Sequence, residues 1–184
     1  MTKKSKKSAI PRSFRKKIQE HRRAKKAIEE SKERLLQRAM ERSTETNNEI
    51  IVTTLKKEKM SEIILEYAQP LLNGTTSTKE EKSAITTAII GWNLSLLPKD
   101  LQSNYIKDIT KSLNPSNPSK SFSDDAHEVF NFLIARKKSL FPKINRLVVD
   151  FELVDTPDGL HLNVVSNVIE KDRQSKKDLP DTPK

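Results

Sequence analysis

Two sets of side chains in this sequence have types and spacing that could take part in chemistry. The first lies near the C-terminus, where Asp150, Glu152 and His161 fall on one face of a predicted β-hairpin. A carboxylate beside a histidine can serve general acid–base catalysis or a metal site. The simpler interpretation is a solvated sheet face, because antiparallel sheets often leave one face in water. We therefore assign no catalytic residue, no metal ligand and no cofactor.

The second set is a basic N-terminal arm. Residues 1–28 carry twelve lysines and arginines and one acid, Glu20, for a net charge of +11, whereas the rest of the chain sums to −1. Such segregation indicates an interaction tail attached to an ordinary domain. The twelve basic residues are Lys3, Lys4, Lys6, Lys7, Arg12, Arg15, Lys16, Lys17, Arg22, Arg23, Lys25 and Lys26.

The interpretation we favour for the arm is contact with phosphates of RNA, DNA or a ribosome, without sequence preference. Helical spacing places Arg12, Arg15, Arg22 and Lys26 on one face. Phe14 is the one aromatic residue of this segment, so base stacking is not indicated. The alternatives are a solubilising tail, a nuclear or organellar address, and a helix resting on anionic lipid.

Composition excludes several classes of site. The chain has no cysteine, which rules out disulfides, thiolate zinc sites and cysteine nucleophiles. Three glycines in the whole chain cannot build a phosphate-cradling loop. The most apolar run, residues 84–97, is shorter than the roughly 20 residues that a membrane span needs. No secretory signal is visible, and we expect a cytoplasmic protein with no membrane span.

The elements that position these residues are mostly helical. A charged helix is predicted over residues 13–43, without Gly or Pro inside it. Its second half carries a narrow apolar seam that is available to the domain, to a partner helix or to a second copy. The seam consists of Ile28, Leu35, Leu36, Ala39 and Met40.

Three-four apolar spacing predicts core helices over residues 55–72, 78–97, 99–113 and 123–141. On the second of these, Trp92 is assigned to the core, Asn93 to a neighbouring backbone group, and Gly91 to a close helix contact. On the third, the residues predicted to face inward are Leu101, Tyr105, Ile109 and Leu113.

The period changes to two over residues 146–169, which predicts a β-hairpin. Leu147, Val149, Phe151 and Leu153 are expected on one face, with Val148 on the face of Asp150 and Glu152. A four-residue loop, TPDG, pairs Leu153 with Leu162 and Phe151 with Val164, which matches the apolar faces. An isolated hairpin is marginal in water, so it must lie on the helices, with residues 50–54 as a candidate third strand.

Two segments, AIIGWNLSLLP (88–98) and RLVVDFELVDTPDGLHLNVVS (146–166), resemble a family of small bacterial proteins in which a helical core precedes a similar hairpin. The resemblance covers about residues 55–168 and favours a bacterial cytosol. It implies no activity, so it transfers no functional residues.

The sequence thus predicts an α+β, mostly helical fold. About four core helices pack on a C-terminal β-hairpin, and a long basic N-terminal helix precedes them. The predicted organisation is an arm with a charged helix over 1–45, a domain over 46–169 and a disordered tail over 170–184. We expect a non-enzymatic accessory protein whose arm contacts RNA or DNA. The alternatives are a protein-interaction module acting through Ile28–Met40, and an enzyme using Asp150, Glu152 and His161.

Overall fold

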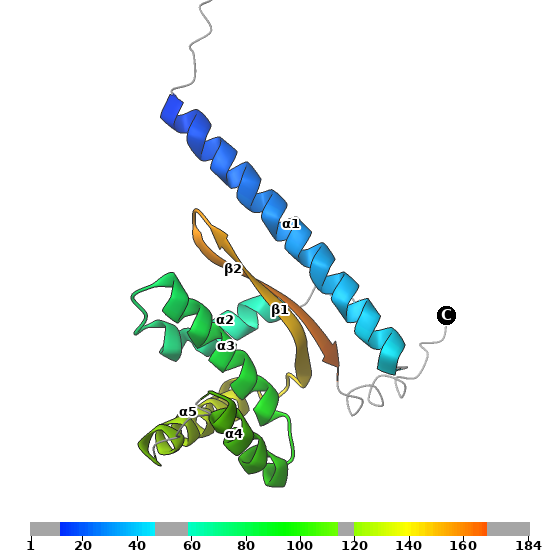
Figure 1. The fold of residues 1–184 in the computed structure, drawn as a ribbon, viewed down its shortest axis with the longest axis vertical. Helices are drawn as coiled ribbons and strands as arrows, with labels where there is room; N and C mark the ends of the chain where they lie inside the picture. Colours follow the sequence, from blue (N-terminus) through cyan, green and yellow to red (C-terminus); the bar gives the residue numbers. More distant parts are fainter. Residues whose placement is uncertain (1–11, 47–58, 114–119, 169–184) are drawn as a thin grey trace, which may run out of the picture.

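The computed structural model describes residues 12–46, 59–113 and 120–168 (Figure 1). Within them, five helices precede a two-stranded antiparallel hairpin, which confirms the predicted α+β, mostly helical class. The candidate strand at 50–54, the C-terminal tail and the four lysines before Ser8 lie outside the described residues. The elements are α1 (Arg12–Thr46), α2 (Met60–Leu72), α3 (Thr78–Ser95), α4 (Lys99–Leu113), α5 (Lys120–Leu140), β1 (Arg146–Thr156) and β2 (Gly159–Val168).

The described elements form three layers, in which the hairpin lies between α1 and the group of helices α2–α5 (Figure 1). The core of the helical group is aromatic. The Tyr67 and Trp92 rings meet edge to face with centroids 5.3 Å apart, and Phe141 packs against both. Burying such large rings provides much of the apolar area that stabilises a small core.

Helix α3 begins with a capping box. The Ser77 hydroxyl accepts a hydrogen bond from the Glu80 amide, and the Glu80 carboxylate accepts one from the Thr76 amide. These bonds satisfy backbone donors at the helix start. The Thr76 amide also holds the pKa of Glu80 below its ordinary value, because the hydrogen bond favours the charged carboxylate.

Helix α4 is rotated relative to the sequence prediction. Leu101 and Tyr105 are 40% and 50% exposed rather than facing inward, and the buried residues are Gln102, Ile106 and Thr110. Both buried polar side chains are satisfied, because the Gln102 amide donates to the Leu97 carbonyl and the Thr110 hydroxyl donates to the Ile106 carbonyl. Satisfied polar groups can be buried at modest cost, so the apolar pattern alone did not fix the buried face.

The close contact predicted at Gly91 is confirmed. A Cβ atom added to Gly91 would lie 2.7 Å from Cδ1 and 2.9 Å from Cβ of Leu133 on α5. The Leu133 Cβ atom is fixed to its own backbone and cannot move away by a rotamer change. Glycine therefore sets the distance between α3 and α5.

We expect Gly91→Ala to lower the free energy of unfolding by about 1–2 kcal/mol, because overpacking costs more than the gain in helix propensity. Urea denaturation measures the change. Gly74→Ala is the matched control, since a Cβ at Gly74 meets nothing within 4 Å. Equal effects of the two substitutions would contradict the close contact.

The register of the hairpin is confirmed, with Leu153 opposite Leu162 and Phe151 opposite Val164. The strands continue to a Thr156–Gly159 pair, so the loop itself is Pro157–Asp158. Gly159 has a φ of 114°, a conformation that other residues rarely adopt.

A β-bulge interrupts the pairing between Val148 and Asp150. The extra residue, Val149, shifts the alternation. As a result Val148 joins the helical core at 4% exposure, and the prediction that it shares a face with Asp150 is wrong. Three successive apolar residues, Leu147 to Val149, concealed this shift from the pattern.

Trp92 and Asn93 of α3 hold the free edge of β1. The Trp92 indole N–H donates to the Arg146 carbonyl at 2.8 Å. The Asn93 amide donates to the Val148 carbonyl and accepts from the Val148 amide, at 2.9 and 3.0 Å. Asn93 thus replaces a neighbouring strand, which satisfies the edge. The assignments of Trp92 to the core and Asn93 to a backbone group are both confirmed.

Candidate nucleic-acid interface on helix α1

Helix α1 lies along the outer face of the hairpin, and it buries a row of small and apolar residues there (Figure 1). Ser31, Leu35 and Ala39 follow one another at four-residue spacing and are at most 1% exposed. The expectation that this sheet face is solvated is therefore wrong. The physical reason is that α1 presents both an apolar row and complementary charge to it.

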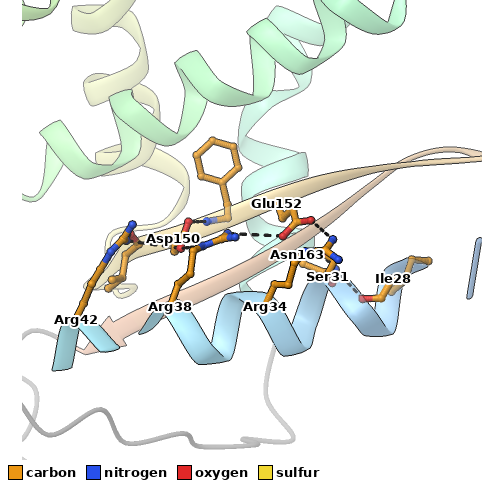
Figure 2. Close-up of polar contacts among 10 residues, drawn as sticks. Ile28, Ser31, Arg34, Arg38, Arg42, Asp150, Glu152 and Asn163 are labelled. Carbon is orange, nitrogen blue, oxygen red and sulfur yellow. Dashed lines mark hydrogen bonds and ion pairs between the residues drawn. The ribbon is translucent and has the colours of Figure 1, made fainter. Parts of the chain in front are cut away.

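Three arginines of α1 meet two carboxylates of β1 (Figure 2). Arg34 donates to Glu152, and the Arg38 Nε atom donates to Asp150 Oδ2 at 2.8 Å. The Arg38 Nη2 atom also lies 3.6 Å from Glu152 Oε2. The four-residue spacing of the arginines matches the two-residue spacing of the carboxylates, since about 6 Å separates the partners along either element. We call Arg34, Arg38 and Arg42 the arginine ladder.

The third arginine of the ladder, Arg42, binds the backbone of β1 at the bulge. Arg42 Nη1 donates to the Val149 carbonyl at 3.2 Å and lies 3.6 Å from Asp150 Oδ2. Because a bulge residue is left out of the strand pairing, its backbone groups need partners elsewhere. Arg42 supplies one and ties α1 to this irregular point of β1.

The carboxylates are less accessible than the arginines that bind them. The side chains of Asp150 and Glu152 are 13% and 23% exposed, against 39% and 53% for Arg38 and Arg34. The hydrogen bonds to these carboxylates raise the pKa of both guanidinium groups above its ordinary value. Ion pairs with this degree of exposure add little net stability.

A second polar contact sets the position of α1 on β2 (Figure 2). The Asn163 side chain, 6% exposed, donates to the Ser31 hydroxyl at 2.9 Å and to the Ile28 carbonyl at 3.2 Å. Sliding α1 along the hairpin would leave these buried groups unpaired, which costs free energy. The docking therefore has one favoured register.

The structure brings together Asp150 and Glu152 of the candidate catalytic set, and guanidinium groups already occupy both. His161 lies on β2, opposite Val154 of β1. The pKa of Glu29 is lowered mainly by the hydrogen bond from Lys32, and His161 adds a smaller lowering effect. Within the described ranges, no three His, Cys, Asp or Glu side chains gather as metal ligands do. This cluster has a structural explanation as the docking site of α1.

The apolar seam is divided between two environments. Leu35 and Ala39 are buried on the hairpin and Ile28 is half-buried, whereas Leu36 and Met40 are 37% and 57% exposed. The sequence analysis missed the arginine ladder. The four-residue repeat of arginines and the alternating acids of β1 can both be recognised in the sequence. Neither pattern shows by itself which other segment it contacts.

The first part of the basic arm continues the same helix past the hairpin loop. His21 lies 3.3 Å from Asp158 in the hairpin loop, and the residues of α1 before His21 extend beyond this loop (Figure 1). The Arg12 side chain and all of Lys3, Lys4, Lys6 and Lys7 lie outside the described atoms. The remaining seven predicted contacts are all exposed: Arg15, Lys16, Lys17, Arg22, Arg23, Lys25 and Lys26.

Few of these cations are neutralised within the described part of the chain. Lys16 pairs with Glu20 at 3.9 Å and Lys26 with Glu30 at 3.3 Å, both on the exposed helix surface. Such pairs are weak and are easily replaced by another anion. Arg15, Arg22 and Lys26 form a row, spaced by seven and four residues, on the side of α1 opposite to Ser31 and Leu35. This row faces away from the domain.

The charge of α1 changes sign just after the arm. Glu29, Glu30 and Glu33 occupy the outward side immediately after Lys26, and all three are exposed. Arg34, Arg38 and Arg42 lie in this acidic half, but they point at the hairpin (Figure 2). The surface available to a polyanion therefore ends at Lys26, about 16 Å along the helix from Arg15 at 1.5 Å per residue.

Comparisons with known proteins give no match: no family model, no curated protein and no solved structure is significantly similar to this chain. Among the helices of the described residues, none has the length and apolar character to cross a membrane.

We expect Leu35→Ala to destabilise the docking of α1 by about 2–4 kcal/mol, the usual range for a truncated buried leucine. The neighbouring Leu36→Ala is the matched control and should cost less than about 1 kcal/mol, because Leu36 is on the exposed side. Amide hydrogen exchange over residues 28–39 measures the difference. Similar protection in the two variants would contradict the docked position of α1.

Proposed function

We propose that this protein is a non-enzymatic accessory protein whose basic arm contacts phosphates of RNA or DNA without sequence preference. The observation that carries the proposal is the outward row of Arg15, Arg22 and Lys26 with its flanking cations. The row is exposed, faces away from the domain and belongs to a helix that is held at a fixed register. Cations in this arrangement bind a polyanion by releasing its condensed counterions.

Docking of α1 supports the proposal on energetic grounds. A free basic tail loses conformational entropy when a polyanion orders it, whereas a helix already packed on the hairpin loses less. The arginine ladder and the Asn163–Ser31 contact therefore act as positioning groups. They do not themselves reach a ligand on the outward side.

The test is a salt titration of full-length protein binding to fluorescent duplexes. Contact with about six phosphates of B-DNA gives a log–log slope near −5. Replacing Arg15, Arg22 and Lys26 together by Gln should reduce the slope by about 2.7, since each phosphate contact contributes about 0.9.

The control removes the same charge elsewhere. Lys59 directly precedes α2, Lys99 and Lys107 lie on α4, and all three are exposed. Their joint replacement by Gln should leave the slope unchanged. If both triple variants change the slope equally, net charge rather than the arm governs binding, and the proposal fails.

A second candidate is protein–protein interaction through the exposed part of the seam. The observation that favours it is the pair Leu36 and Met40, which lie four residues apart on one side of α1 and are 37% and 57% exposed. Neighbouring exposed apolar side chains often mark a contact surface.

If a second copy binds there, Met40→Asp should convert dimers to monomers in sedimentation velocity. Gln37→Asp, on the same exposed helix but off this pair, is the control and should leave the association unchanged. If the wild-type protein stays monomeric up to high concentration, this surface does not mediate self-association.

A further inference from the structure

We propose that the ligand of the arm is double-stranded DNA, and that the arm of α1 enters its major groove. This inference rests on the proposed function, because it names the class of nucleic acid for the same surface. It is carried by the distribution of cations around the helix axis, by the direction in which the domain lies and by the exposed side chains of the arm.

Basic side chains occupy more than one side of the arm. At 100° per residue, Arg15, Arg22 and Lys26 form the outward row. Lys16 and Arg23 lie about 90° to one side of that row, and Lys25 lies about 80° to the other side; all are exposed. A flat anionic surface would meet only the outward row. A groove with a phosphate backbone on each wall meets the row and both flanks.

The body of the protein does not obstruct such an approach. The hairpin contacts the opposite side of α1, through Ser31, Leu35 and Ala39. The turns before His21 extend beyond the hairpin loop, whereas the cations after His21 lie beside the hairpin on the outward side and flanks of α1 (Figure 1). The exposed basic part from Arg15 to Lys26 is about 16 Å long. The acids from Glu29 onward then repel phosphates, which limits the depth of entry to this length.

The dimensions select among nucleic acids. An α-helix with side chains is about 10–12 Å across, and the major groove of B-DNA is about 12 Å wide. The major groove of A-form RNA is deep and narrow and does not admit a helix. Single strands are held largely by aromatic side chains that stack on bases, and the sequence of the arm has one aromatic residue, Phe14.

The experiment compares three fluorescent ligands of equal length with the full chain at one salt concentration: a DNA duplex, an RNA duplex and single-stranded DNA. We expect the DNA duplex to bind at least tenfold more tightly than either of the others. Equal or tighter binding of the RNA duplex or the single strand would overturn the inference, while the proposed phosphate contact would stand.

Variants of the flanks test the groove directly. Lys16→Gln with Arg23→Gln removes one flank, and Lys25→Gln removes the other. Each lost contact should reduce the slope on the DNA duplex by about 0.9, as much per charge as in the outward row. If the flank variants leave the slope unchanged while the outward row still matters, the arm meets a flat surface and the groove is wrong. If neither set matters on any ligand, the proposed function itself fails.

Discussion

A two-stranded hairpin on its own is marginally stable in water, and in the described structure helices cover both of its faces. Phe151, Leu153 and Leu162 face the helical group, and α1 covers the other face with Leu35, Ala39 and the arginine ladder. The polar residues of the second face are thereby turned into a docking site. The same contact that completes the hairpin also fixes where the basic arm points.

Charge is used in two different ways on one helix. The three arginines of the ladder face the hairpin, where they pair with two carboxylates that are themselves partly buried. The cations of the arm face solvent and have few partners within the described residues. This difference follows from position around the helix axis rather than from residue type. A count of basic residues along the sequence cannot distinguish the two groups, whereas the position of the hairpin can.

The sequence predicted most local features well, but it gave the wrong buried face for α4 and predicted one long-range feature poorly. The boundaries of α4, the hairpin register, the role of Asn93 and the close contact at Gly91 depend on nearby pattern or turn chemistry, and all are confirmed. The docking of α1 on the hairpin joins residues more than a hundred positions apart. The sequence could not predict it, because the apolar seam of α1 fits any apolar partner equally well. The bulge at Val149 stayed hidden because the alternation is lost where three apolar residues follow one another. The nucleic-acid contacts remain a prediction.

The separation between Arg34 and Glu152, 118 positions, has a consequence for the order of events during synthesis. Helix α1 leaves the ribosome first, and its partner strand follows on the order of ten seconds later at ordinary elongation rates. Throughout that interval the nascent chain carries the arginine ladder without its carboxylates, in addition to the cations of the arm. Completion of the hairpin pairs these three arginines with Asp150 and Glu152 at once. The finished protein is thus a weaker and more directional polycation than its own nascent chain.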